Sequence, residues 1–241
     1  MLYSYRDMFP TNTLKFRPAT LAAGDDRWFV EAWDSTLPYL ASIGSTSQWQ
    51  YIPSNLPGAV SKVKKMVEDS DLSSQKYPVS SPEVLSEHGA PPLDWDKAYV
   101  AEIDIKREDI PIALADRYSN EQGEIVTIPV GAMVLQGRSP EYVRSVIPEQ
   151  DEKDPFIFLA FLMTDHRAGK LAKGSGSALL NIAKEEVKRL GLKRLCGDCW
   201  RGNGRRLVGY YDGQGLKAIG DFDVPKNEQD SWEGAVIEWR A

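Results

Sequence analysis

Glycines and lysines gather in this sequence where an apolar stretch gives way to a helical pattern. Gly169, Gly174 and Gly176 would let the backbone approach a ligand closely, and Lys170 and Lys173 add positive charge. The first N–H groups of a helix have no partner within the helix, and the helix dipole is positive there, so this place suits a phosphate. The alternative is a tight turn that only joins a strand to a helix.

Two familiar phosphate-binding patterns do not fit the segment. A P-loop carries Lys and then Ser or Thr after its second spaced glycine, whereas Ser175 and Gly176 follow Gly174 here. The dinucleotide fingerprint needs a glycine three residues after Gly176, and Leu179 stands there. The segment is therefore a pyrophosphate loop of another type, or the tight turn.

The elements around the loop must position it. Residues 156–163 form an unbroken apolar run of strand length, typical of a strand covered on both faces. A helix follows, with an apolar face made of Leu179, Ile182, Ala183, Val187 and Leu190. Residues 192–200 return as a strand, and a strand–helix–strand order predicts a right-handed crossover between parallel strands.

The rest of the chain predicts a mixed α/β fold. Helical spacing indicates helices over 25–35 and 57–69 and another beginning near Asn203, and the composition of 37–56 indicates a long loop. Strands are expected over 14–17, 99–105, 128–136, 216–224 and 232–240.

A second group of polar and aromatic residues follows the strand over 192–200. Asn203 opens it, and Tyr210 and Tyr211 stand on the helix that precedes Gly215. Adjacent helical positions point about 100° apart, so only one of the two tyrosines can face a given reacting atom.

Together the two patterns resemble the GNAT superfamily of acyltransferases. Its signature is an apolar strand, then Arg/Gln-x-x-Gly-x-Gly/Ala and an amphipathic helix, and residues 173–180 match the glycine half. The superfamily also has an Asn, a helix and a Tyr four residues before Gly-Phe, which Asn203, Tyr211, Gly215 and Leu216 match with Leu for Phe.

The chain departs from this signature in two places. Leu171 stands where Arg or Gln is expected, and Arg167 lies four residues earlier, as if the loop carried an insertion. The spacing from Asn203 to Tyr211 is one residue longer than the commonest form.

The resemblance implies a sheet flanked by helices in which the two central parallel strands splay apart around acyl-CoA. Backbone groups of Leu162, Met163 and Thr164 would pair with the pantetheine arm, and Asn203 would hydrogen-bond the arm. The pyrophosphate would be held by Arg167, Lys173, Gly174, Ser175, Gly176 and Ser177. Tyr211 would protonate the departing CoA thiolate, which a tyrosine with a pKa of about 10 can do at neutral pH.

An acidic residue interrupts the strand over 192–200. Alternation puts Cys196, Asp198 and Trp200 on one face and Cys199 on the other, so we expect two free thiols rather than a redox pair or metal site. A buried acid is costly unless it is paired or functional. Asp198 is therefore a general base or amine anchor, or it forms a salt bridge with a nearby Arg.

Other residues are second choices. Asp165 and His166 lie just past the first of the two central strands and are alternative bases. Glu31 and Asp34 lie on the first helix, which in this superfamily helps to wall the acceptor pocket, or they form its solvated face. The aromatic residues near the following loop line an acceptor pocket or pack the core; they are Trp33, Tyr39, Trp49 and Tyr51.

The composition excludes several classes of function. Lys and Arg total 29 against 35 Asp and Glu, so the formal net charge is −6, which disfavours nucleic acid or an anionic membrane as partner. Two cysteines and two histidines are too few for a disulfide framework and leave few metal ligands. No apolar run approaches the roughly 20 residues of a membrane span, and the start lacks the apolar core of a secretory signal. We expect a cytoplasmic protein without a metal.

We therefore expect one GNAT-like domain over 1–241, with a loose lead-in at 1–13 and an insertion or hairpin at 106–126. The expected activity transfers an acetyl group from acetyl-CoA to a primary amine of a small molecule, by direct attack in a ternary complex. The alternatives are a protein or peptide amine as acceptor, or a degenerate module that binds acyl-CoA or a partner without turnover. Strand 232–240 could pair across a homodimer or close its own sheet.

Overall fold

Seven strands form one mixed sheet in the computed structural model, which describes residues 13–49, 52–78, 89–226 and 231–241. In spatial order they are β1 (Lys15–Pro18), β2 (Asp96–Lys106), β3 (Ile125–Gln136), β4 (Phe156–Thr164), β5 (Arg194–Trp200), β7 (Ser231–Arg240) and β6 (Lys217–Pro225). Within the described chain β4 and β5 are the one parallel pair. The expected mixed sheet with a central parallel pair is confirmed.

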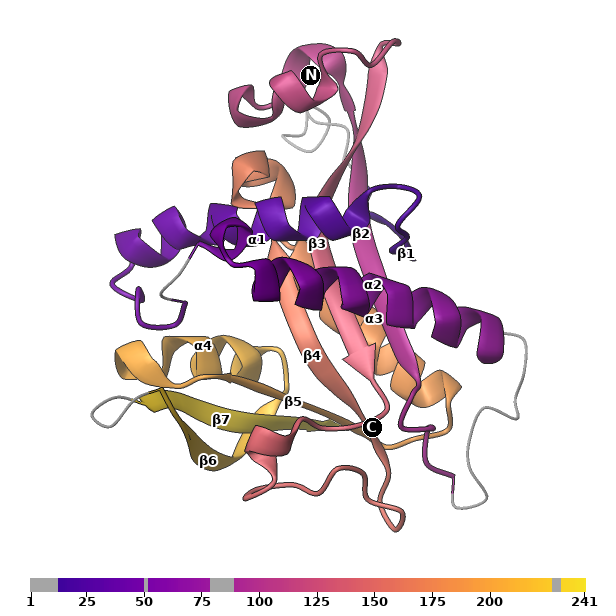
Figure 1. Ribbon diagram of the computed structural model, residues 1–241, viewed down its shortest axis with the longest axis vertical. Coiled ribbons are helices and arrows are strands. Elements are labelled where there is room, and N and C mark those ends of the chain that lie inside the picture. The colour runs from indigo at the N-terminus through magenta and orange to yellow at the C-terminus, as the bar shows by residue number, and fades with distance from the viewer. Residues whose placement is uncertain (1–12, 50–51, 79–88, 227–230) are drawn as a thin grey trace, which may run out of the picture.

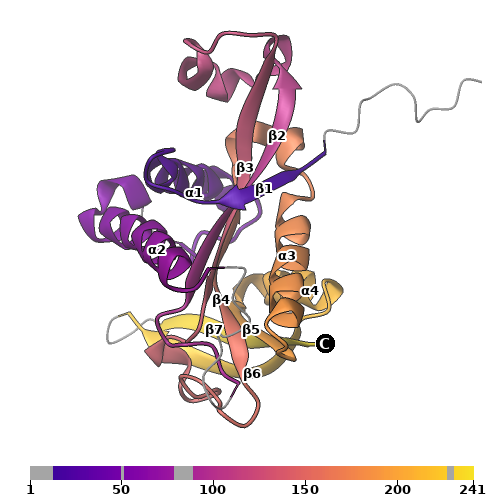
Figure 2. The same ribbon diagram turned by 90° about the vertical axis from the view of Figure 1, so that its right-hand side faces the viewer.

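Helices cover both faces of this sheet. They are α1 (Asp25–Ser42), α2 (Pro57–Lys76), α3 (Ser175–Arg189) and α4 (Gly202–Gly213). Figure 2 shows α1 and α2 on one face and α3 and α4 on the other. Trp28, Phe29 and Val63 belong to a buried cluster with β2 and β3 on the first face. Leu179 and Leu180 belong to a larger cluster on the second face.

Helix α1 is longer than the sequence predicts. The expected loop over 37–56 is wrong in its first part, because α1 continues through Pro38 to Ser42. Pro38 has no N–H to donate, which removes one helical hydrogen bond. Trp28, Thr36 and Leu40 give α1 a buried face along its length, and such packing outweighs local propensity in most helices.

The parallel strands β4 and β5 separate part-way along their length. Their register runs from Phe156 opposite Arg194 to Leu159 opposite Gly197, and no pairing follows. Gly197 sits where the strands are tightest, since a Cβ there would lie 3.1 Å from the Leu159 Cβ. The register of β3 on β4 skips Ala160 at the same level, and such a bulge bends its strand. Figure 1 shows β4 and β5 diverging beyond this point.

The last strand closes its own sheet. β7 lies between β5 and β6 and pairs with both, so neither of its edges is left for a second copy of the chain. A homodimer through other surfaces stays a prediction. Residues 106–126 connect the antiparallel strands β2 and β3 and contain three short 3-10 helices. None of the helices described here has the length and apolarity that crossing a membrane requires.

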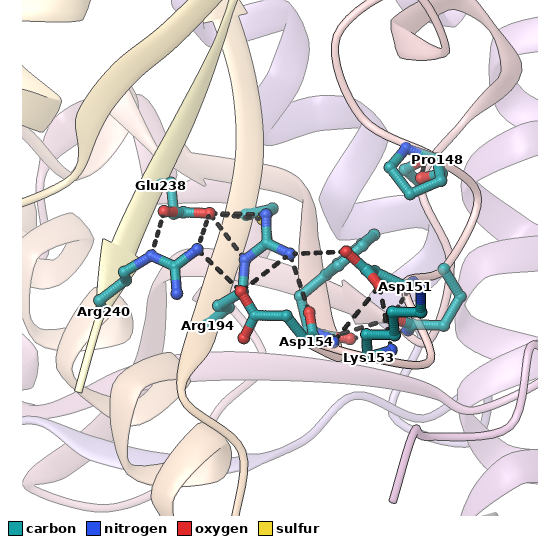
Figure 3. Close-up of polar contacts among 11 residues, drawn as sticks. Pro148, Asp151, Lys153, Asp154, Arg194, Glu238 and Arg240 are labelled. Atoms are coloured by element: carbon teal, nitrogen blue, oxygen red, sulfur yellow. Dashed lines mark hydrogen bonds and ion pairs between the residues drawn. The ribbon is translucent and has the colours of Figure 1, made fainter. Parts of the chain in front are cut away.

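A cluster of charges closes the paired end of β4 and β5, as Figure 3 shows. Arg194, whose side chain is 8% exposed, donates to Glu238 at 2.7 Å and to the backbone oxygen of Asp154 at 2.8 Å. Arg240 contacts both acids, at 2.6 Å and 2.9 Å. Asp151 lies 3.6 Å from Arg194. The cluster ties the start of β5 to the end of β7 and to the loop that leads into β4.

We predict that Arg194→Ala lowers the free energy of unfolding by about 3 kcal/mol, because it removes the donor to the Asp154 backbone oxygen and leaves the nearly buried Glu238 with Arg240 as its remaining ion-pair partner. Chemical denaturation would measure the loss. The matched control is Lys153→Ala, an exposed residue of the same loop, which should change stability by less than about 0.5 kcal/mol. Equal stability of the two variants would contradict a structural role for the cluster.

Candidate active site

Two cavities meet where β4 and β5 separate. The larger, of about 630 Å³, runs along the end of β4, the glycine loop and the starts of α3 and α4. The smaller, of about 330 Å³, is lined by residues of α1, α2, β4, β5 and β7. Six residues line both cavities: Gln48, Trp49, Leu162, Trp200, Leu207 and Tyr211. The gap between the strands is therefore a passage with a compartment at each end.

The glycine loop presents an uncapped helix end to the larger cavity. Gly174 has a φ of 87° in the left-handed region and precedes α3, whose first turn has no side-chain cap. Lys173, Gly174, Gly176 and Ser177 line the cavity. Since the first N–H groups of a helix lack helical partners, this end can bind an anion.

Ser175 fixes the loop in place rather than lining the cavity. Its buried hydroxyl donates to the backbone oxygen of Ala172 at 2.8 Å. A Cβ on Gly131 of β3 would lie 3.0 Å from that hydroxyl oxygen, so the glycine makes room for the contact. The predicted contribution of Ser175 to a bound phosphate is thereby restricted to its backbone.

The open end of β4 supplies unpaired backbone. Leu162, Met163 and Thr164 line the larger cavity and pair with β3 on one side. On their other side, where β4 and β5 have separated, these residues pair with no residue of β5. Backbone N–H and C=O groups require partners when water is excluded, so this edge can bind an extended ligand in the manner of a strand.

Arg167 does not replace the missing arginine of the loop, and this expectation is corrected. Its guanidinium donates to Asp165 at 2.8 Å and to Glu31 at 2.8 Å, and it does not line the larger cavity. Leu171, at the position of the missing residue, packs against the core. The chain therefore uses both positions for folding.

Asp165 and His166 are also occupied. Asp165 is fully buried and accepts from Trp28 Nε1 at 3.1 Å as well as from Arg167. The His166 ring stacks on Tyr39 at 4.3 Å, and burial lowers the pKa of this histidine. Asp165 is tied to an arginine, so it is not a poised base.

Asn203 is not among the residues that line either cavity, and its expected role toward a bound arm stays a prediction. Its Nδ2 donates to the Ile43 backbone oxygen at 2.8 Å and to the Ser45 hydroxyl at 2.7 Å. Trp232 Nε1 donates to the Gln48 backbone oxygen at 3.1 Å. These bonds tie the loop that follows α1 across the passage.

The two tyrosines of α4 have different surroundings. Tyr211 is buried and lines both cavities, and burial raises the pKa of its phenol well above the ordinary value, not the unshifted pKa that the sequence analysis assumed. The phenol therefore keeps its proton at neutral pH. Tyr210 is 39% exposed, lines only the larger of these two cavities, and places its hydroxyl 3.4 Å from the Ser177 hydroxyl.

Asp198 lines the smaller cavity and accepts a hydrogen bond from the Tyr142 hydroxyl at 3.2 Å. Burial raises the pKa of its carboxyl to about 6, against smaller lowering effects of Tyr142 and Lys62. No arginine within the described ranges forms an ion pair with it, so the salt-bridge alternative is not observed. A carboxylate with this pKa can accept a proton near neutral pH.

The cysteines lie in different core clusters, as alternation predicts. Cys196 packs with Phe156 and Val236, and Cys199 belongs to the cluster that holds Tyr211. Both are free thiols, and burial raises the pKa of each to about 12. In the part of the chain that the structure describes, no group of three or more His, Cys, Asp or Glu could hold a metal.

Solved structures similar to this chain share one fold. A GNAT-family acetyltransferase from Listeria monocytogenes is 15% identical, with a TM-score of 0.53 over 95% of each chain. The PaiA N-acetyltransferase from Thermoplasma acidophilum in complex with coenzyme A is 14% identical, with a TM-score of 0.51 over 95% of this chain and 99% of that one. The yncA structure from Salmonella typhimurium, with its cofactor acetyl-CoA, is 11% identical, with a TM-score of 0.50 over 95% and 94%.

The chain has the GNAT fold. No protein-family model matches the sequence, and no curated protein matches it. At these identities the similarity extends to the fold alone, and it confirms the resemblance to the GNAT superfamily at that level.

Several residues that line the two cavities were missed by the sequence analysis. Arg206 is exposed, lines the larger cavity, and has no ion-pair partner among the residues described. Lys62 and Tyr142 line the smaller cavity. No spacing signals any of them, because they come from separate elements.

The candidate residues on α1 and in the loop after it have different surroundings. Glu31 binds Arg117 and Arg167, and Asp34 accepts from the Ser54 backbone N–H at 3.1 Å, so neither carboxylate faces a cavity. Trp33 and Trp49 line the smaller cavity and Tyr39 the larger. Tyr51 lies outside the described residues.

The raised pKa of Asp198 predicts a pH-dependent effect on stability. The pKa of this carboxyl rises from 3.8 in the unfolded chain to about 6 in the folded one. The folded state therefore loses stability as the pH increases from about 4 to about 6, and the loss is complete above about pH 6. Asp198→Asn removes this cost, so its free energy of unfolding relative to wild type should increase by about 2 kcal/mol between pH 4 and pH 7. Denaturation at both pH values measures it.

The control is Asp116→Asn, at an exposed position. Its effect relative to wild type should be nearly the same at both pH values. A pH-independent effect of Asp198→Asn would show that the carboxyl is not shifted.

Proposed function

We propose that the protein transfers an acetyl group from acetyl-CoA to a primary amine of a small molecule. The observation that carries the proposal is the passage itself: an anion-binding helix end on one side, a carboxylate with a pKa of about 6 on the other, and Tyr211 bordering both. Complexes with coenzyme A or acetyl-CoA are known for two proteins of the same fold, which supports the choice of co-substrate.

In this proposal acetyl-CoA occupies the larger cavity. The backbone N–H groups of Gly174, Ser175, Gly176 and Ser177 hold the pyrophosphate, and Lys173 adds charge. Tyr210, whose hydroxyl lies 3.4 Å from the Ser177 hydroxyl, and Arg206, which lines the same cavity, take the place of the missing loop arginine. The unpaired edge of β4 over Leu162–Thr164 binds the pantetheine arm.

The acceptor amine enters from the smaller cavity. Asp198 takes a proton from the ammonium group, so that the neutral nitrogen can attack the thioester carbonyl. The new C–N bond forms as the C–S bond breaks, the electron pair leaves with sulfur, and Tyr211 donates its phenolic proton to the thiolate.

Direct attack is favoured over a covalent enzyme intermediate. The pKa of about 12 keeps both thiols protonated at neutral pH, whereas a nucleophilic cysteine needs a lowered pKa. The acceptor compartment, at about 330 Å³, is at the lower end of the range for ligand pockets, which favours a small amine over a peptide.

Calorimetric titration with acetyl-CoA tests the proposal. We expect micromolar binding, with no binding of ATP. Gly174→Val should weaken acetyl-CoA binding more than about tenfold, because a side chain at a φ of 87° distorts the loop at the anion site.

The matched control is Gly191→Val at the other end of α3, which has a similar φ of 68° and open space around it. It should lose stability but keep its affinity for acetyl-CoA. Failure of the wild type to bind any CoA species would refute the proposal, and equal affinities of the two variants would refute the loop assignment.

Steady-state kinetics separate the two proton-transfer residues. Tyr211→Phe should lower kcat by about 100-fold and leave the KM for acetyl-CoA nearly unchanged, because it removes the proton donor but keeps the ring. Asp198→Asn should abolish the rise of kcat/KM with pH through about pH 6.

Tyr210→Phe is the matched control on α4. Because Tyr210 lies on the anion site rather than at the junction, we expect a changed KM for acetyl-CoA with kcat retained. Unchanged turnover in Tyr211→Phe would show that Tyr211 is not the acid. An unaltered pH profile in Asp198→Asn would show that Asp198 is not the base.

A further inference from the structure

The smaller cavity has walls made largely of aromatic rings. They come from α1, the loop that follows it, β4, β5, β7 and the segment after β3: Trp33, Trp49, Phe161, Trp200, Trp232 and Tyr142. Indole and phenyl rings bury a large area with few rotatable bonds, so such walls bind flat apolar groups at low entropic cost.

The rings hold one another in position. Trp33 lies edge-on to Trp49 at 5.4 Å between centroids and to Phe161 at 5.5 Å. Trp232 is fixed by its hydrogen bond to the Gln48 backbone oxygen and by contact with Phe222. The walls are therefore formed before a ligand arrives, which reduces the cost of binding.

Two charged residues line this cavity, Asp198 and Lys62. Asp198 lies on β5 near the junction with the larger cavity, and its charge acts on Tyr211. The reacting nitrogen of the acceptor must approach Asp198 and Tyr211. Lys62 is exposed on α2 and forms no ion pair with any residue described, so a second positive charge on the acceptor would meet repulsion.

One buried polar atom in the walls is unsatisfied. Trp33 Nε1 has no hydrogen-bond partner among the described residues. Leaving a buried N–H unpaired costs free energy, and most such groups in proteins have a partner. The Trp33 ring lines the cavity, but protein atoms cover its Nε1, so the ring contributes apolar surface and not a hydrogen bond to the site.

We infer that the acceptor is an arylalkylamine: one primary amine joined by a short chain to a flat aromatic body, with no second positive charge. This inference names the acceptor class of the proposed acetyl transfer and rests on that function. The ammonium group meets Asp198 near the junction, and the aromatic body lies among the indoles.

A panel of four amines tests the class, with thiol release from acetyl-CoA as the readout. The probes are 2-phenylethylamine, its 4-methoxy derivative, butylamine and 1,4-diaminobutane. We expect kcat/KM for 2-phenylethylamine to exceed that for butylamine by at least about tenfold, because the ring adds buried apolar area. The methoxy derivative should also react faster than butylamine, and the diamine should react slowest because Lys62 repels its second charge.

Three variants locate the effects in the cavity. Trp33→Leu should lower kcat/KM for 2-phenylethylamine by about tenfold and hardly change it for butylamine. Trp33→Phe keeps an aromatic ring in the wall, so it should retain most of the preference for 2-phenylethylamine over butylamine. Trp239→Leu is the control, since Trp239 packs near Lys184 and Lys188 outside both cavities and should leave the preferences unchanged.

Binding of the amines is measured separately, by quenching of tryptophan fluorescence without acetyl-CoA. If acetyl-CoA binds but butylamine reacts as well as 2-phenylethylamine, the acceptor class is wrong and the acetyl transfer stands. Turnover of a peptide amine with none of the small amines would also overturn the class.

If acetyl-CoA fails to bind, the proposed function fails. The quenching experiment still tests whether the smaller cavity binds arylalkylamines. Tighter binding of 2-phenylethylamine than butylamine, lost in Trp33→Leu but not in Trp239→Leu, would support an arylalkylamine site. Equal quenching by all four amines would overturn it.

Discussion

The site depends on the point at which β4 and β5 stop pairing. Up to Leu159 and Gly197 they are ordinary parallel neighbours, and beyond it neither strand satisfies the other's backbone. The bulge at Ala160 bends β4, and the charge cluster around Arg194 holds the opposite, paired end together. A sheet can stay open at one end in this way only because β3 and β7 still support the outer edges of the two strands.

This separation places opposite electrostatic environments at the two ends of one passage. The α3 N-terminus, Lys173 and Arg206 form a local positive region in a chain with a net charge of −6. On the other side burial keeps Asp198 poised between its protonated and ionised forms. Tyr211, buried and neutral, lies between them, so a phosphate-bearing donor and a cationic acceptor would be drawn to different sides.

The loop after α1 couples the two compartments. Gln48 and Trp49 line both, and the loop is tied to α4 by Asn203 and to β7 by Trp232. Asn203 is thus part of the framework that shapes the passage. The same bonds orient the indoles of the smaller cavity, so the framework and the aromatic walls are one structure.

The sequence by itself determined the local features of this protein. The apolar run of β4, the glycines before α3 and the periodicity of α3 each depend on neighbouring residues, and together they indicated the parallel pair and the anion site. Alternation along β5 also separated Cys196 from Cys199 correctly. Such features can be read from spacing because the backbone geometry repeats every two or 3.6 residues.

Only the tertiary structure decided which polar side chains are free. Arg167 pairs with Glu31, 136 residues away, and Asn203 Nδ2 donates to the Ile43 backbone oxygen, 160 residues away. Arg206 is left without an ion-pair partner among the described residues and becomes part of the site in their place. A charged group binds whichever partner the fold brings near, and that proximity is set by packing of distant segments rather than by local sequence.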